Sequence, residues 1–242
     1  MLFSLLLSLA HAALPPRYEG VADFSNCSGF LVTTASRASS DRAWVATNGH
    51  CWQGLLGGMV LKPAEVRRDQ HIKRSLSLVN DQGRKLRFTT DRLVVATMTG
   101  TDLALYELKE SYESLQSKGI RPFVLGRPVL GEAVEVISGH KNSSHSCRIE
   151  AITDTREGGY RFTNSLRLSS ECQQGSGTSG SPVLRAGTRE VIAIANSFNK
   201  NGRACGNNNP CEVDGESVSV QFGARYAQQL TLRGAELLQE IP

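Results

Sequence analysis

The stretch GTSGSPVLRAG (177–187) passes from a glycine-rich turn into an apolar run. Ser179 lies in the turn, directly before Gly180, and Pro182 begins the run. Because glycines leave the backbone unshielded, another molecule can approach such a turn closely. The stretch therefore predicts a strand from about residue 182 and makes Ser179 a candidate nucleophile at its entrance.

On both sides of this turn, short runs rich in β-branched and aromatic residues dominate the chain. Examples are GFLVTTA (29–35), AWVATN (43–48), EVIAIANS (190–197) and SVSVQFG (217–223). Turn residues separate the runs at intervals typical of β-barrels and sandwiches. The Gly158-Gly159 pair between two such runs indicates a hairpin turn. We therefore predict an all-β fold.

The composition of the chain is that of a globular protein. It has 242 residues, 40% hydrophobic and 21% charged, with a formal net charge of +4. This length suffices for one large domain or two small ones with a real core. The excess positive charge is scattered in pairs such as Arg67-Arg68, without an arginine-rich run or an aromatic RNA motif. We therefore expect no nucleic-acid partner.

The N-terminal sequence MLFSLLLSLAHAALPP has the features of an export signal. Leu2 to Ala10 is an apolar run too short to span a bilayer, and Ala10-His11-Ala12 matches a small-x-small cleavage site. We predict a signal peptide over 1–12 and a secreted or periplasmic protein. No other segment is apolar and long enough to predict a membrane span.

The six cysteines suggest three disulfides, which agrees with an oxidising compartment. Cys147 and Cys172 lie nearly equidistant from the predicted hairpin turn, so we pair them. Cys205 and Cys211 flank the short loop GNNNP and are predicted to pair locally. That leaves Cys27 for Cys51.

Two segments depart from the β pattern. The polar segment 109–122 ends in a proline and is predicted to link two halves of the protein. The segment ARYAQQLTLRGAELLQEI (224–241) has apolar residues near helical spacing, which predicts a C-terminal helix.

A serine nucleophile needs a base, a group that orients the base and donors for the oxyanion. His50 follows an apolar run and adjoins a cysteine, and Asp102 opens the apolar run DLALYEL. The backbone N–H groups of Gly177 and Ser179 could both be aimed at one oxyanion. These residues together form a candidate catalytic set of Ser179, His50 and Asp102.

Four motifs in this order resemble those of the trypsin/chymotrypsin-like serine peptidases. They are CSGFLVTT (27–34), AWVATNGHC (43–51), TDLALYEL (101–108) and GTSGSP (177–182). The last is similar to the form found in bacterial secreted members akin to glutamyl endopeptidases. The resemblance covers about residues 23 to 235.

The resemblance implies two packed antiparallel β-barrels with the active site in the cleft between them and a helix at the end. We accordingly expect a signal peptide over 1–12, an N-terminal barrel over 13–120 and a C-terminal barrel over 121–242. It also implies a monomeric endopeptidase that cleaves protein or peptide substrates without a metal or organic cofactor. Asn196, Ser197 and Phe198 are expected to pair with the substrate backbone as a β-strand.

Some residues depart from the family pattern. Thr178 precedes the nucleophile where animal trypsins have an aspartate that pairs with a freed N-terminus, so the turn is expected to be shaped by local hydrogen bonds. Ala195 stands about where glutamate-specific members have a histidine, so glutamate preference is not supported. Four polar residues remain as weak candidates for specificity, although we expect them on the surface: Glu171, Gln173, Asp214 and Glu216.

We weighed three alternatives. An α/β-hydrolase needs a histidine after its serine, and no histidine follows Ser179. A metal site at His140, His145 and Cys147 lacks the usual zinc spacing. A catalytically silent binding protein on a protease-like fold remains the alternative function, because fold alone never proves activity.

Overall fold

A computed structural model describes residues 15, 18–52 and 61–230, and this part of the chain is almost entirely β-structure. The first half contains β1 (Val21–Asp23), β2 (Ser28–Thr33), β3 (Arg42–Thr47), β4 (Val66–Gln70), β5 (Ser75–Val79), β6 (Lys85–Thr97) and β7 (Leu103–Ser111). The second half contains β8 (Phe123–Leu125), β9 (Ala133–Ser138), β10 (Ser143–Glu157), β11 (Tyr160–Leu168), β12 (Pro182–Arg185), β13 (Glu190–Phe198), β14 (Cys211–Asp214), β15 (Ser217–Ser219) and β16 (Arg225–Gln229). The short helices η2 (Gly49–Cys51, 3₁₀) and α1 (Tyr112–Gln116) accompany them.

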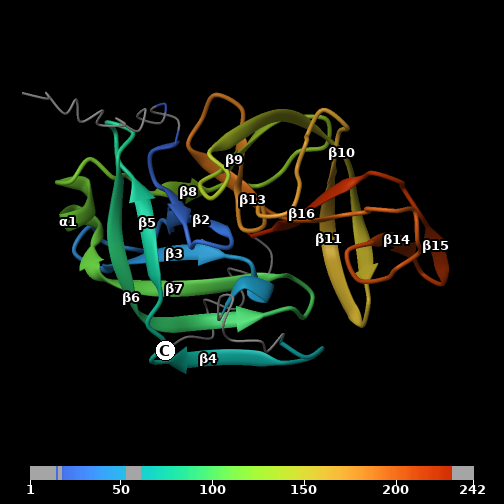
Figure 1. Ribbon diagram of the computed structural model, residues 1–242, viewed down its shortest axis with the longest axis horizontal. Coiled ribbons are helices and arrows are strands. Elements are labelled where there is room, and N and C mark those ends of the chain that lie inside the picture. Colours follow the sequence, from blue (N-terminus) through green and yellow to red (C-terminus); the bar gives the residue numbers. More distant parts are fainter. Residues whose placement is uncertain (1–14, 16–17, 53–60, 231–242) are drawn as a thin grey trace, which may run out of the picture.

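Strands of each half close into a ring. In the first, hydrogen bonds run through β1, β5, β6, β7, β3 and β2 and return to β1. In the second they run through β13, β12, β9, β10, β11 and β16 and return to β13. Figure 1 shows the first barrel in blue to green and the second in yellow to red, side by side. The expected two-barrel, all-β fold is therefore confirmed.

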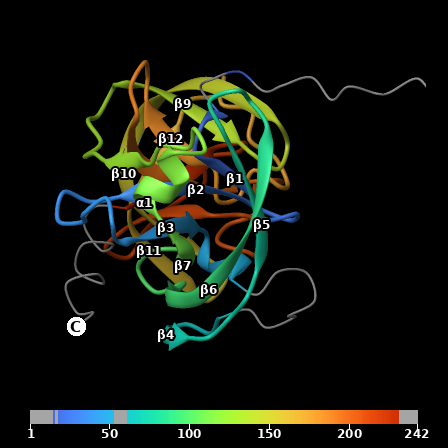
Figure 2. The ribbon, with the colours of Figure 1, turned by 90° about the vertical axis from the view of Figure 1, so that its left-hand side faces the viewer.

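The barrels are joined by hydrogen bonds as well as by packing. β8 pairs in parallel with β2 of the first barrel and with β13 of the second. The predicted linker 109–122 contains the end of β7 and α1, whose N-cap is the Ser111 hydroxyl. In the view of Figure 2, α1 lies in front of the first barrel. The expected boundary between residues 120 and 121 falls between α1 and β8.

The core follows this division. One cluster fills the first barrel around Leu31, Leu93 and Tyr106, and another fills the second barrel around Val136 and Leu166. A third cluster joins apolar residues of both halves. Fully burying an aliphatic or aromatic side chain contributes about 1.5–3 kcal/mol, so the joint core holds the two barrels, and thus the walls of any site between them, in one arrangement.

The hairpin and disulfide predictions agree with the structure. Gly158 and Gly159 connect β10 to β11, which pair antiparallel. The structure contains the disulfides Cys27–Cys51, Cys147–Cys172 and Cys205–Cys211. The first of these ties the start of β2 to the end of η2, the helix that carries His50.

The predicted C-terminal helix is wrong at its start. Residues 225–229 form β16, which pairs with β11 and β13 and closes the second barrel. Tyr226, Ala227 and Gln228 are buried there. Alanine and glutamine favour a helix by less than about 1 kcal/mol per residue, and pairing and burial on both sides of a strand outweigh this preference. The rest of the predicted helix, 231–241, and the predicted signal peptide lie outside the described residues.

None of the helices formed by the described part of the chain has the length and apolar character needed to cross a membrane.

Candidate active site

The turn that carries Ser179 is held by local hydrogen bonds. The Thr178 N–H and hydroxyl both donate to the Gly175 carbonyl, at 3.1 and 2.7 Å. The Ser28 N–H donates to the Ser179 carbonyl at 2.7 Å and thereby fixes the turn to β2. Thr178 thus shapes the turn through neutral hydrogen bonds, as the sequence predicts.

Position 180 needs a glycine because of its backbone conformation and because there is no space for a side chain. Its φ is +82°, and a Cβ there would lie 2.1 Å from the Ser28 carbonyl oxygen. Any other residue would have to push the turn away from β2, since backbone cannot yield as a side-chain tip can. The glycine after the serine therefore lets the two barrels approach each other at the nucleophile.

The backbone N–H groups of Gly177 and Ser179 make no hydrogen bond to another described residue. Gly177 has a φ of +88°. Two free donors on one small turn can bind the negative oxygen of a tetrahedral intermediate. This arrangement fits the oxyanion role that the sequence predicts for them.

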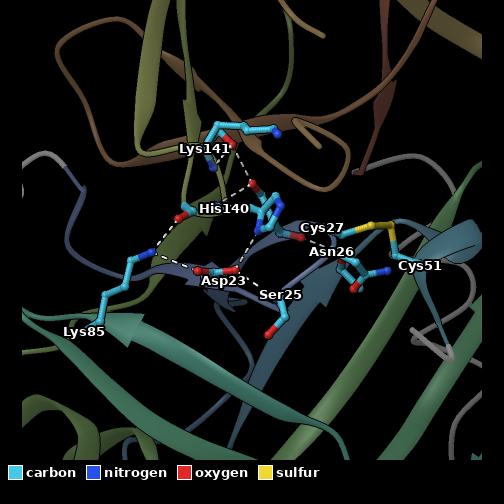
Figure 3. A network of polar contacts seen from close by, with 12 residues as sticks. Asp23, Ser25, Asn26, Cys27, Cys51, Lys85, His140 and Lys141 are labelled. Carbon is cyan, nitrogen blue, oxygen red and sulfur yellow. Dashed lines mark hydrogen bonds and ion pairs between the residues drawn. A yellow bond between two sulfur atoms is a disulfide. The ribbon is translucent and has the colours of Figure 1, made fainter. Parts of the chain in front are cut away.

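A polar network lies behind this turn. His140 Nδ1 is 3.1 Å from Asp23 Oδ1, and Lys85 Nζ is 2.9 Å from Asp23 Oδ2. Figure 3 shows Asp23 between these two side chains, with the Cys27–Cys51 bridge nearby. A Cβ on Gly177 would lie 2.5 Å from Lys141 Cε. The network therefore holds the 140–141 segment close to the turn that carries Ser179.

His140 and Cys147, two of the three residues of the alternative metal site, are engaged in other interactions. His140 pairs with Asp23, and the Cys147 sulfur is bonded to Cys172. His50 lies near the sulfur atoms of Cys27 and Cys51, but these also form a disulfide and offer no thiolate.

His50 and Asp102 form a close pair. His50 Nδ1 lies 2.7 Å from Asp102 Oδ2, and the His50 N–H donates to Asp102 Oδ1 at 2.9 Å. Asp102 is 1% exposed, and its backbone carbonyl accepts from Asn48 Nδ2 at 3.0 Å. Because an ionised carboxylate only accepts, it selects the tautomer with the proton on Nδ1. That leaves Nε2 of the neutral ring free to accept a proton.

Gly49 allows this pairing. A Cβ on Gly49 would lie 2.0 Å from the Thr97 carbonyl oxygen and 2.9 Å from Asp102 Oδ1. The turn preceding His50 therefore has no room for a side chain. The small residue brings the backbone of η2 against the strand end that carries Asp102.

The electrostatics of the site favour a more basic histidine. Burial alone would lower the pKa of His50, but the negative charge and hydrogen bond of Asp102 outweigh it, with a smaller contribution from Glu157. The pKa of His50 is therefore raised above its usual 6.5.

His50, Asp102 and Ser179 line one cleft of about 510 Å³. Ser179 Oγ lies 3.4 Å from the Asn196 carbonyl oxygen and makes no hydrogen bond to the His50 ring. Rotation about the serine Cα–Cβ bond changes where Oγ points, and catalytic hydrogen bonds commonly tighten only when substrate binds. A larger depression of about 750 Å³ on the first barrel contains neither Ser179 nor His50, so the candidate catalytic residues lie in the smaller cleft.

Asn196, Ser197 and Phe198 also line the cleft. They form the end of β13, where its pairing with β16 is interrupted between Ala195 and Phe198. The structure thus brings the residues expected to bind the substrate backbone next to the candidate nucleophile. The remaining weak candidates for specificity, Glu171, Gln173, Asp214 and Glu216, are exposed and do not line it.

The sequence did not predict that the β10–β11 hairpin contributes residues to the cleft. Glu157, Tyr160 and Phe162 line the cleft together with His50. The Gly100 N–H donates to the Arg161 carbonyl at 3.1 Å, which brings the hairpin to the loop before Asp102. The sequence shows only a hairpin with an acidic residue at its tip, and nothing local indicates which surface the tip reaches.

Comparison with known proteins agrees with this geometry. Residues 27–194 match the trypsin-like peptidase domain family. Among solved structures the chain is similar to Deg5 (TM-score 0.54, 15% identity, 90% of this chain and 87% of that one). It is also similar to the thermostable serine protease AL20 from an extremophilic microorganism (0.53, 14%, 92% and 96%) and to neuropsin, a serine protease of mouse brain (0.52, 14%, 93% and 96%). No curated protein sequence matches the chain.

Proposed function

The chain belongs to the trypsin-like peptidase family and is a serine-type endopeptidase; from this premise we propose that Ser179, His50 and Asp102 are its catalytic triad. The observation that supports the proposal is their convergence on one cleft, with a 2.7 Å His50–Asp102 contact and two free N–H groups beside the serine.

In the proposed reaction Ser179 Oγ forms a bond to the scissile carbonyl carbon, and its proton passes to His50 Nε2. The Gly177 and Ser179 N–H groups bind the resulting oxyanion. His50 then donates that proton to the amide nitrogen, the C–N bond breaks and the amine leaves an acyl-enzyme. Water, deprotonated by His50, then attacks the acyl carbon; the bond from that carbon to Ser179 Oγ breaks, His50 returns the proton to Oγ, and the second product leaves as a carboxylic acid.

Asp102 holds the ring in the tautomer that accepts at Nε2 and stabilises the imidazolium formed in each half of the reaction. Asn196 to Phe198 pair with the substrate backbone and place its carbonyl over the oxyanion donors. We also propose that the protein is exported and acts as a monomer. The three disulfides and the family agree with an extracellular or periplasmic site of action.

We expect a fluorophosphonate probe to label the protein once, on Ser179. Only a serine activated by a base and flanked by an oxyanion site reacts readily with such a reagent. Intact-mass measurement followed by peptide mapping locates the adduct. Absence of labelling in folded protein would instead favour the catalytically silent binding protein.

We expect kcat/KM to decline on the acid side with a midpoint above 6.5, the usual pKa of histidine. Neutral His50 is the base, and Asp102 and Glu157 favour its protonated form. As pH falls through the raised pKa, the neutral fraction and therefore kcat/KM fall by about tenfold per pH unit. A pH series with a neutral peptide substrate measures the limb, and a midpoint below 6 would contradict the proposed environment.

A further inference from the structure

Glu157 is an acidic residue inside the proposed catalytic cleft that the reaction does not use. It ends β10 at the tip of the hairpin and is half-buried. Its Oε1 accepts a hydrogen bond of 2.7 Å from the Asn208 N–H, and the Ser197 side chain interacts with the same carboxylate. The loop that carries Asn208 and strand β13 therefore fix its position from two sides.

In the described part of the chain Glu157 has no lysine or arginine counter-ion, and the positive group near it is the His50 ring, which is charged only when protonated. No lysine or arginine is among the described residues that line the cleft. Burial raises the pKa of Glu157, and the nearby Asp102 raises it further, while hydrogen bonds from Ser197 and Asn208 and the charge of His50 lower it without cancelling the rise. A half-buried carboxylate without a lysine or arginine partner is stabilised when a ligand places a positive charge beside it.

The place of Glu157 indicates which part of a substrate it meets. Ser197 is the middle residue of the segment proposed to pair with the substrate backbone, and Asn196 adjoins the nucleophile. In the proposed binding mode this segment pairs with the substrate backbone that leads to the scissile carbonyl, so a carboxylate beside Ser197 faces residues on the acyl side of the scissile bond.

The surroundings suit a long basic side chain. Tyr160 and Phe162 have stacked rings 6.3 Å apart and line the same cleft, as does Phe198. The methylene stem of lysine or arginine packs on aromatic surfaces while its charged end reaches a carboxylate. An acidic side chain of the substrate would meet the carboxylates of Glu157 and Asp102, and no lysine or arginine is among the described residues that line the cleft.

We infer that Glu157 is a specificity-determining residue that binds a lysine or arginine side chain of the substrate on the acyl side of the scissile bond. The inference rests on the proposed function, because it assumes that peptides bind along Asn196 to Phe198. It assigns the selectivity to the β10–β11 hairpin, a different element from the loop that precedes the nucleophile.

The test compares the wild-type chain with Glu157→Gln on peptide libraries varied at the four acyl-side positions. Glutamine keeps an acceptor for the Asn208 N–H, so the hairpin is expected to keep its shape. Wild type should prefer lysine or arginine at one position. For that peptide, kcat/KM should fall about 10- to 100-fold in Glu157→Gln, as expected when a charged hydrogen bond is lost. The matched norleucine peptide should change less than about threefold.

Glu216→Gln makes the same charge change on an exposed residue outside the cleft and serves as the control. The inference is overturned if wild type shows no acyl-side preference for a cation, or if Glu157→Gln retains it. It is also overturned if both peptides slow equally, since Glu157 would then act through His50. Fluorophosphonate labelling of every variant separates a failure of this inference from a failure of the proposed triad. If the protein is labelled but shows no preference for a cationic side chain, only the role of Glu157 is refuted.

Discussion

Ser179→Ala is expected to lower kcat for peptide hydrolysis by about 10⁶-fold while the protein stays folded. Alanine removes the attacking oxygen and leaves the turn intact, because the hydrogen bonds that shape it come from the backbone and from Thr178. Among the described residues the Ser179 hydroxyl donates to the Asn196 carbonyl at 3.4 Å, and Asn196 lines the cleft. Thermal unfolding should therefore change little, and the loss is read from single-turnover hydrolysis of a peptide substrate.

Ser181→Ala is the matched control. Ser181 lies two positions further along, and its buried hydroxyl has no hydrogen-bond partner among the described residues. Removing an unsatisfied hydroxyl costs little, so activity and stability should stay close to wild type. If Ser179→Ala retained more than a hundredth of the wild-type kcat in a preparation free of contaminating protease, another nucleophile would have to be sought.

The elements that the sequence predicted well are those whose information is local. A glycine-rich turn around a serine, an aspartate that opens an apolar run and a histidine beside a cysteine each depend on a few adjacent residues. Their order along the chain resembles that of the trypsin/chymotrypsin-like peptidases, and this resemblance implied the two barrels that the closed strand rings confirm. The Cys147–Cys172 bridge could be predicted because a hairpin places residues equidistant from its turn opposite each other.

The wrong and missing predictions concern residues whose structure depends on contacts with residues far away in the sequence. Residues 225–229 have helix-forming side chains, but their burial and pairing are decided by β11 and β13, which lie far away in the sequence. In the sequence, nothing distinguishes Glu157 from other polar residues at hairpin tips. Only the packing of the two barrels brings this tip close to His50. The sequence offered Glu171, Gln173, Asp214 and Glu216 as candidates for specificity, whereas the hairpin residue Glu157 is the acidic residue besides Asp102 among the described residues that line the cleft.

Asp102→Asn is expected to lower kcat by about 10⁴-fold with little change in KM. Both oxygens of Asp102 accept hydrogen bonds from His50, one from its backbone N–H and one at ring Nδ1. Asparagine has a single acceptor oxygen. If that oxygen keeps the backbone bond, the amide NH₂ faces Nδ1, and the ring must present Nδ1 as an acceptor and carry its proton on Nε2. Nε2 then cannot take the proton of Ser179.

The measurement is steady-state kinetics on a peptide substrate together with an NMR titration of His50. The pKa of His50 should fall in Asp102→Asn, because the negative charge that raises it is gone. Asp214→Asn, an exposed position on β14, is the control and should change neither quantity. Asparagine is isosteric and removes a buried charge, so unfolding should shift by no more than about 1 kcal/mol. If instead the amide turned its oxygen to Nδ1, the usable tautomer would survive and only the backbone bond at η2 would be lost. Activity within tenfold of wild type would reveal that outcome and would mean that an acceptor at Nδ1 is sufficient, and that neither the negative charge of Asp102 nor its bond to the His50 backbone is needed.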